Sequence, residues 1–587
     1  MNLINRFFEY VVIFWSAQII LTWSLSALQM YNVKLALLLT VSLCAIFLYK
    51  EYKNLFEIRL YIRSLLTKLR KLKRLSKILF FTTSVIWFGF FLYTLIFIFL
   101  GPAINWDSLT YHLTKSVVAN QTGSWWYHPD VSVARVNIFG SNSSILNAIA
   151  FSVLGKDYLV ELPQLIAALI IPLSLFYIGV TFFIKRKIYS FIATISVLSI
   201  PLYLYESKTT QNDLVFTAIL LISMILVNNF LKNFSFRNLI LTLFSLGILC
   251  GSKYHGIIAA GLLSLFIVYG LVNNRNEIKK KHILSIILLS PILVFLALPS
   301  NIIGGLYYHS PFALDSGDAK KLSIGFGTIW ANIKHFGTWF YLKPIGDISY
   351  FSHDIGHAGF INMVAIPIFI FVSIRTILSR KLSQILFIST IVGLITLLFL
   401  VRAPDQWDLR LILFLPITAI FIATLFVISI QNKLIKLFCY TGVFIISLLN
   451  IMVTFYFVDW EVIKYSLWSI RNGEGVMSIG NYYASRYMPN IQAFEDDSKE
   501  GIHKVLIVGY NDAPLYPYYG DRWQNEVQYM VLKNINNEYL QDIYWDYLII
   551  YHNSAKNILD KIEALNLNYN TLITDYYVNI YKNESID

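Results

Sequence analysis

The chain has 587 residues, of which 57% are hydrophobic and only 14% are charged. Soluble domains carry about 25% charged residues, so the composition excludes a wholly soluble protein and makes lipid the solvent for much of the chain. The net charge of +13 would suggest a nucleic-acid partner in a soluble protein. Here we attribute it to loops on one side of a membrane, and we expect no nucleic-acid partner.

Thirteen apolar runs are candidates for membrane-spanning helices, because a helix needs about 20 apolar residues to cross a bilayer. In chain order they are Tyr10–Met30, Val33–Tyr49, Ile78–Leu100, Leu159–Ile184, Ile188–Leu204, Leu214–Leu231, Leu239–Cys250, Ile257–Val272, Ile283–Pro299, Phe360–Ile374, Leu386–Val401, Leu411–Ile430 and Leu437–Phe457. The sequence therefore predicts an all-α polytopic membrane protein.

Lysines and arginines give these spans an orientation, because cytoplasmic loops carry an excess of both. The strongly basic segment 50–77 is predicted to be cytoplasmic. Every second loop after it is also basic, namely Lys185–Lys187, Lys232–Arg237, Arg275–Lys281, Arg375–Lys381 and Lys433–Lys436. This alternation predicts a cytoplasmic N-terminus and an extracytoplasmic C-terminus.

The chain divides into three parts on this topology. Residues 1–77 hold two N-terminal spans and the basic segment, and residues 78–458 form the membrane core with long outer loops at 101–158 and 300–359. Residues 459–587 have the composition of a soluble protein. The strand-like runs Lys504–Tyr510, Tyr547–Tyr551 and Thr571–Tyr581 and the helix-like stretch Ala555–Leu565 predict a small extracytoplasmic α/β domain there.

Two aspartates at the outer boundary are candidates for chemistry. Asp107 follows an apolar span closely, and Asp213 stands at the start of a later one. A carboxylate beside lipid is costly unless it faces water or a partner. Either residue could instead cap a helix, because Asp is a good N-cap residue. The residues alone leave function and capping open.

Four short motifs, taken in order, carry a family resemblance. They are Trp106–Leu113 (WDSLTYHL), Thr210–Asp213 (TQND), Leu246–Tyr254 (LGILCGSKY) and Trp407–Pro416 (WDLRLILFLP). They resemble the outer-loop motifs of bacterial GT-C glycosyltransferases, in the branch similar to protein mannosyltransferases and aminoarabinose transferases. The resemblance covers residues 78–457.

The resemblance implies a GT-C membrane core that moves a monosaccharide from a polyprenyl-phosphate carrier to a hydroxyl of a glycan, lipid or protein, with inversion. A bacterial plasma membrane and undecaprenyl phosphate are the implied setting. Asp107 matches the position of the family's general base, which a hydroxyl acceptor needs within hydrogen-bond reach. Partial desolvation is expected to raise the pKa of Asp107. Ser108 stands where the family often has a second acid.

The leaving phosphate needs positive charge, and few cations lie in the short outer loops. Those present are Lys208, Lys253, Arg402 and Arg410. An arginine could grip phosphate bidentately, and a lysine could act as a point charge. The alternative is that these side chains snorkel to the interface.

Other polar residues have weaker roles. Asp213 could orient the acceptor, hold a cation or assist Asp107. Tyr111 and His112 line the site or anchor a juxtamembrane helix. The spacing of two histidines in the second outer loop could serve a metal, although a polar re-entrant loop is the alternative: His353 and His357. Members of the family differ in metal use, so no cofactor is assigned and Mg²⁺ or Mn²⁺ stays open.

Three other functions stay open. A surface-polysaccharide polymerase or ligase also has many spans and a large outer loop, but it would favour outer Arg and His clusters. A transporter would favour inverted repeats and charges at mid-membrane, and the sequence has neither. A non-catalytic envelope assembly protein is the third. The cysteines form no CxxC pair, so no disulfide framework or zinc site is predicted: Cys44, Cys250 and Cys439.

Overall fold

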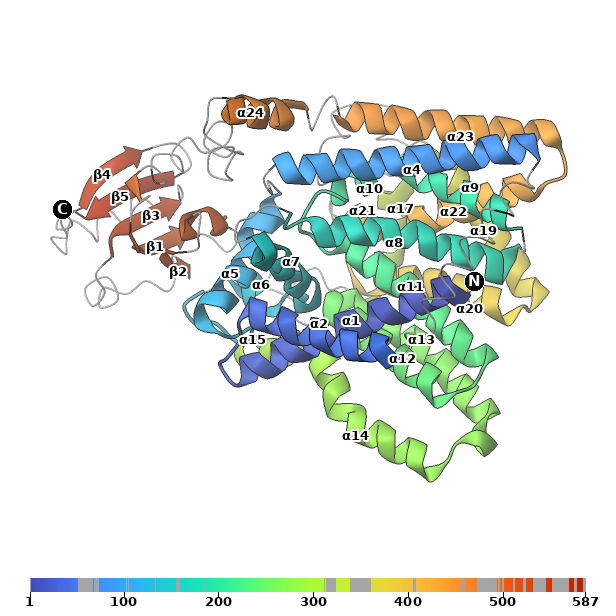
Figure 1. Cartoon of the computed structure of the whole chain (residues 1–587), viewed down its shortest axis with the longest axis horizontal. Helices are drawn as coiled ribbons and strands as arrows, with labels where there is room; N and C mark the ends of the chain where they lie inside the picture. Colours follow the sequence, from blue (N-terminus) through green and yellow to red (C-terminus); the bar gives the residue numbers. More distant parts are fainter. Residues whose placement is uncertain are drawn as a thin grey trace.

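The structure is a computed structural model of the whole chain. It describes residues 2–583 apart from the longer stretches 51–66, 68–72, 313–323, 338–360, 472–493, 532–544 and 552–568 and a number of shorter gaps. Helices form the body of the molecule, and a small sheet lies at one end of it (Figure 1).

Each predicted apolar run lies on a helix. These helices are α1 (Asn2–Ala27), α2 (Val33–Lys50), α4 (Arg74–Leu100), α8 (Leu162–Ile178), α9 (Lys187–Thr194), α11 (Asp213–Lys232), α12 (Phe236–Ser252), α13 (Tyr254–Asn273), α14 (Lys280–Ala297), α19 (Asn362–Ser379), α20 (Leu382–Val401), α22 (Phe414–Ser429) and α23 (Lys433–Thr454). In the part of the chain that the structure describes, nine helices are long and apolar enough to cross a membrane, and four apolar helices are shorter. The prediction of a polytopic membrane protein is confirmed.

One predicted span is not a single helix. The run Ile188–Leu204 contains α9, the 3₁₀-helix η3 (Ile195–Ser199) and the short helix α10 (Pro201–Glu206). Pro201 has no N–H to continue a helix, and it stands instead in the first turn of a new one. Hydropathy did not distinguish this broken path from one continuous helix.

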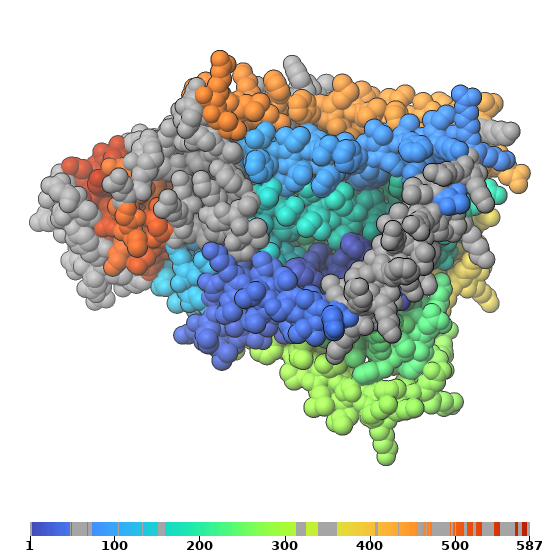
Figure 2. All heavy atoms as spheres, viewed as in Figure 1, coloured from blue at the N-terminus to red at the C-terminus, as the bar shows by residue number. Residues whose placement is uncertain are grey.

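Burial separates the helices of the centre from those that face lipid. Helix α11 is apolar on all sides, and 89% of its spanning window is buried, whereas the figure for α14 is 6%. Helix α4 presents Phe81, Val85 and Phe88 outward, each more than half exposed. Its atoms run along one long edge of the body beside those of α23 (Figure 2). Exposed apolar stripes of this kind are expected where the neighbour is lipid.

Several short helices, among them α5, α6 and α7, lie between the long helices and the sheet (Figure 1). The short helices of the chain are the π-helix η1 (Ser108–His112), α5 (Leu113–Thr122), α6 (Ala134–Ile138), α7 (Ser141–Leu154), α15 (Pro299–Tyr308), α17 (Phe326–Gly337), α21 (Asp408–Leu411) and α24 (Trp460–Arg471). Helix η1 is a single π turn that continues directly into α5. Such turns often occur at functional sites.

The C-terminal segment forms a five-stranded sheet in the order β2-β1-β3-β5-β4. Its strands are β1 (Lys504–Gly509), β2 (Glu526–Val531), β3 (Tyr547–Tyr551), β4 (Tyr569–Thr574) and β5 (Val578–Asn583). Strand β1 is parallel to β2 and β3, and the pairs β3–β5 and β4–β5 are antiparallel. The prediction of β1 and β3 is confirmed. The prediction of one strand-like run over Thr571–Tyr581 was wrong, because this run covers parts of two paired strands, β4 and β5. The stretch 555–565 lies outside the described residues.

The sheet packs directly on the first outer segment. Leu109 and Val117 share one apolar core with Val505 and Ile507 of β1. The backbone N–H of Leu515 donates to the carbonyl of Leu109 at 3.2 Å. The sheet is therefore attached to the turn that carries Asp107.

Candidate active site

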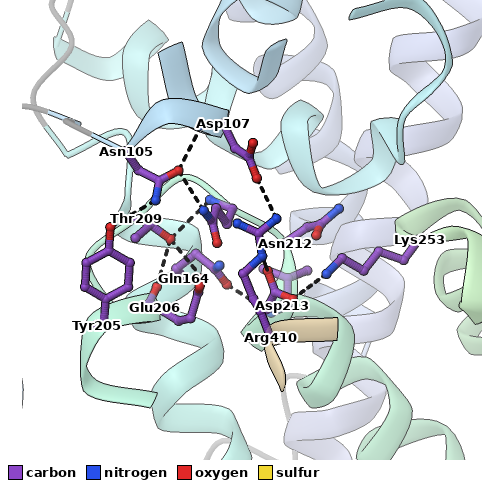
Figure 3. Close-up of polar contacts among 12 residues, drawn as sticks. Asn105, Asp107, Gln164, Tyr205, Glu206, Thr209, Asn212, Asp213, Lys253 and Arg410 are labelled. Atoms are coloured by element: carbon purple, nitrogen blue, oxygen red, sulfur yellow. Dashed lines mark hydrogen bonds and ion pairs between the residues drawn. The ribbon is translucent and has the colours of Figure 1, made fainter. Parts of the chain in front are cut away.

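Four charged residues from four separate segments meet at the sheet end of the helical bundle. Asp107 precedes η1, Asp213 opens α11, Lys253 lies between α12 and α13, and Arg410 is on α21. Figure 3 shows their side chains pointing toward one another. These four include both predicted acids and two of the four predicted phosphate-binding cations.

The four side chains alternate in charge. The Nη2 atom of Arg410 is 2.6 Å from Oδ2 of Asp107, and its Nε is 3.8 Å from Oδ2 of Asp213. The Nζ atom of Lys253 donates to Oδ1 of Asp213. The side chains are between 2% and 12% exposed. Each buried charge therefore faces at least one opposite charge, which is the condition under which buried ions are tolerated.

Neither Asp107 nor Asn212, the residues at the two N-cap positions, makes a side-chain capping bond, and the carboxylates of Asp107 and Asp213 face cations instead. The four predicted cations are also buried: Lys208, Lys253 and Arg402 are each less than 10% exposed, and the side chain of Arg410 is 12% exposed. This arrangement favours charge pairing over capping for the two acids.

The turn that carries Lys253 is held by two close contacts to Ser252. The side-chain amide of Asn212 donates to the carbonyl of Ser252 at 3.0 Å. A Cβ atom added to Gly140 would lie 2.0 Å from the same carbonyl oxygen. The backbone of Lys253 is extended, so α12 ends and α13 begins on either side of it. This break in the helix directs Lys253 toward Asp213.

An amide network joins the two acidic segments. Asn105 accepts a hydrogen bond from the backbone N–H of Asp107 at 3.0 Å and from the side-chain amide of Gln211 at 2.6 Å. Asn105 also donates to the hydroxyl of Tyr205 at 3.0 Å. These residues were not among the predicted site residues, although Asn105 and Gln211 each lie two positions from a predicted acid.

The pKa of Asp107 moves in the direction opposite to the one expected from the sequence. Burial alone would raise it, but the charges of Arg410 and Arg135 and the hydrogen bond from Arg410 hold the pKa of the Asp107 carboxyl below its usual value. The prediction of a raised pKa was wrong because it counted desolvation and not the paired cation. In this arrangement Asp107 is ionised at neutral pH.

His112 and Tyr111 lie beside Asp107. Burial, together with the nearby cations Arg410, Lys253 and Lys115, lowers the pKa of His112 to about 3, so its ring is neutral at physiological pH. Its Nδ1 is 3.0 Å from the hydroxyl of Ser144. The ring of Tyr111 is 4.4 Å from that of His112.

The remaining predicted residues have other partners. The Nζ atom of Lys208 donates to the hydroxyl of Tyr93 at 3.1 Å and lies 4.7 Å from the ring centre of Phe97. Arg402 donates to the hydroxyl of Tyr254, the residue after Lys253, at 2.7 Å. His353 and His357 lie outside the described residues.

A metal ion would compete with cations that are already in place. Among the described residues, no group of three or more His, Cys, Asp and Glu side chains is arranged to hold a metal. The two oxygens of Asp213 face Lys253 and Arg410. A divalent ion on Asp213 would therefore have to displace one of these side chains.

Comparison with known proteins identifies the fold. No protein-family model and no curated protein matches the chain. The crystal structure of ArnT from Cupriavidus metallidurans in the apo state matches with a TM-score of 0.51 and 9% identity, covering 85% of this chain and 98% of that chain. The structure of ArnT bound to undecaprenyl phosphate matches with a TM-score of 0.52 and 10% identity, covering 86% and 98%. The chain therefore has the fold of these two ArnT structures.

Proposed function

We propose that the protein is a membrane glycosyltransferase that moves a monosaccharide from a polyprenyl-phosphate carrier to a hydroxyl group of a glycan, lipid or protein. The observation that carries the proposal is the direct contact between the Asp107 carboxylate and the Arg410 guanidinium. It brings a base and a phosphate-binding group together at the end of the spanning helices. The undecaprenyl phosphate bound to ArnT, which has the same fold, supports the donor class.

Arg410 and Lys253 are the proposed ligands of the donor phosphate. The guanidinium of Arg410 presents several donors in a plane that matches phosphate oxygens, and Lys253 supplies a second positive charge. Both side chains are about nine-tenths buried. Electrostatic stabilisation of a leaving phosphate is strongest in such a water-poor site.

Asp107 is the proposed general base. The acceptor hydroxyl attacks the anomeric carbon, the bond from that carbon to the phosphate oxygen breaks, and its electron pair leaves with the phosphate. The hydroxyl proton passes to a carboxylate oxygen of Asp107. Attack opposite to the leaving group inverts the anomeric carbon, as the resemblance implies.

Arg410 links the two roles. Without donor, the guanidinium forms an ion pair with Asp107 and holds the pKa of that carboxyl low, which makes it a weak base. A donor phosphate competes for the same guanidinium. As Arg410 turns part of its charge to the phosphate, the basicity of Asp107 rises. Donor binding thus prepares the base before the acceptor reacts.

The sheet unit is proposed to contribute to the acceptor side. It packs on Leu109, two residues from Asp107, and it pairs with the same outer segment through the N–H of Tyr529, which donates to the carbonyl of Asp130 at 3.1 Å. The alternation of basic loops supports an extracytoplasmic location for this end of the bundle. The proposed setting, a bacterial plasma membrane, follows from the family resemblance.

The test compares Asp107→Asn with Asp130→Asn in the purified protein. Asp130 lies in the same outer segment but is exposed, so its variant controls for the loss of one charge there. We expect Asp107→Asn to lower the rate of sugar transfer from a polyprenyl-phosphate sugar by about 10³-fold, the usual contribution of a general base. Asp130→Asn should retain the wild-type rate.

Two outcomes would contradict this assignment. Wild-type transfer by Asp107→Asn would remove Asp107 as the base. Absence of transfer in the wild-type protein with every donor tested, together with transport of the lipid-linked sugar across vesicles, would favour a transporter.

A further inference from the structure

A second charged site lies at the opposite end of the helices that carry the candidate active site. Helix α11 starts at Asp213 and ends at Lys232, and its 20 residues rise by about 30 Å. At the far end is a cavity of about 350 Å³. It is lined by the π-helix η2 (Gly179–Phe183), which continues α8, by the end of α11 and by the start of α20.

The charge of this cavity is positive and unbalanced. Lys232 and Lys381 line it, and its lining contains no Asp or Glu. Among the described residues, neither lysine has a carboxylate within ion-pair distance. The Nζ atom of Lys232 lies 5.9 Å from the ring centre of Phe182, which is also in the lining.

A buried amide also faces the cavity. Asn228 lines it and is only 2% exposed. Its side chain makes no hydrogen bond with any residue that the structure describes. Because Asn228 lines the cavity, its amide is available to a ligand there.

The start of α20 adds backbone donors. Lys381 occupies the N-cap position without a side-chain cap, and Leu382 and Ser383 of the first turn line the cavity. The first N–H groups of a helix have no partner within the helix, and together with the helix dipole they favour an anion. This helix end, the two lysines and Asn228 converge on one space.

We propose that this cavity binds a phosphate group, and that its source is the headgroup of an anionic phospholipid. Lys232 and Lys381 neutralise the phosphate, and Asn228 and the first turn of α20 donate hydrogen bonds to it. The location favours a lipid, because α8, α11 and α20 are membrane-spanning helices and the cavity lies at their ends. Apolar lining residues offer contacts for the acyl chains: Val180, Phe183, Leu231 and Leu382.

The experiment measures binding of short-chain phosphatidylglycerol to the full-length protein in neutral detergent, with phosphatidylcholine and inorganic phosphate as comparison ligands. The test variant is Lys232→Gln/Lys381→Gln. The matched control is Lys280→Gln/Lys281→Gln, which removes the same charge at the start of α14. A third variant, Lys232→Arg/Lys381→Arg, keeps both charges.

We expect the test variant to bind phosphatidylglycerol at least about tenfold more weakly, because it removes both of the positive charges that attract an anionic headgroup. The control and the Arg variant should bind it like the wild type. Equal binding by the test variant and the control would overturn the site. Equal affinity for phosphatidylglycerol and inorganic phosphate would overturn the lipid as its source.

Discussion

The positively charged side chains at the two ends of α11 have different surroundings. At the Asp213 end, Arg410 and Lys253 are buried and each faces a carboxylate. At the other end, Lys232 and Lys381 line a cavity without one. A paired cluster can exchange one anion for another without leaving a buried charge alone. An unpaired cluster can only gain an anion from outside, so the first arrangement suits turnover and the second suits steady binding.

Lys115 is an intermediate case. It is 2% exposed, and within the part of the chain that the structure describes its Nζ donates to two neutral oxygens, the carbonyl of Asn137 at 3.1 Å and the hydroxyl of Ser141 at 2.6 Å. Its burial lowers the pKa of the ammonium group to about 7. Burial without a carboxylate therefore lowers the pKa of this lysine with no charge partner to oppose the shift.

The largest stability effect is expected from breaking the paired cluster. Asp213→Asn should lower the free energy of unfolding by about 3–5 kcal/mol, because it leaves Lys253 buried without its carboxylate. The double variant Asp213→Asn/Lys253→Met should lose less than the sum of its two single variants. Unfolding in detergent, measured for all four proteins, gives the coupling free energy.

The matched change at the other end is Lys381→Gln, which breaks no pair. Its free energy of unfolding should equal that of the wild type in lipid-free detergent. Two outcomes would contradict this difference between the two ends. The first is that the changes in the free energy of unfolding of Asp213→Asn and Lys253→Met simply add. The second is that Lys381→Gln loses as much stability as Asp213→Asn.

A smaller effect is expected at the turn that directs Lys253. Gly140→Ala places a Cβ atom 2.0 Å from the carbonyl oxygen of Ser252, so backbone must move. We expect a loss of about 1–3 kcal/mol in the free energy of unfolding and slower sugar transfer. Gly261→Ala in α13 is the control, because a Cβ there meets nothing within 4 Å. Its unfolding should match that of the wild type or improve slightly.

The smallest effect is expected for the pH dependence that Lys115 gives to the free energy of unfolding. Since the pKa of Lys115 is about 7 in the folded chain and near 10.5 in the unfolded chain, the unfolded chain binds more protons between these values. Stability of the wild type should therefore rise with pH across this window, by at most about 1.4 kcal/mol per pH unit. Lys115→Met lacks this contribution.

Thermal unfolding at pH 7 and at pH 9.5 tests this point. The melting temperature of Lys115→Met relative to that of the wild type should be higher at pH 7 than at pH 9.5. An advantage that does not change with pH would mean that Lys115 stays charged throughout.

Sequence reasoning succeeded where one physical rule dominates. Lipid requires long apolar helices, so all the predicted runs lie on helices. The sequence did not predict contacts between residues that are distant along the chain. Nothing in it pairs Arg410 with Asp107, which are 303 positions apart. The shift in the pKa of Asp107 was therefore predicted in the wrong direction. The hairpin within Thr571–Tyr581 was missed because both of its strands have the same β-forming composition.

The residues of the amide network, but not their contacts, could have been selected from the sequence. Asn105 and Gln211 are close to the two acids along the chain, but polar residues near an interface are common, and their mutual contact depends on the approach of two distant loops. The cavity at the far end was not predicted either, because Asn228 and Lys381 belong to helices that the sequence places far apart.

The central claim is that Arg410 holds both Asp107 and the donor phosphate. Its most direct test is the affinity of purified protein for polyprenyl phosphate, measured for the wild type, Arg410→Lys, Arg410→Ala and the control Arg471→Ala on the exposed end of α24. We expect binding that is weaker by about tenfold or more in Arg410→Ala, an intermediate affinity in Arg410→Lys and no change in Arg471→Ala. Unchanged affinity in Arg410→Ala would contradict it.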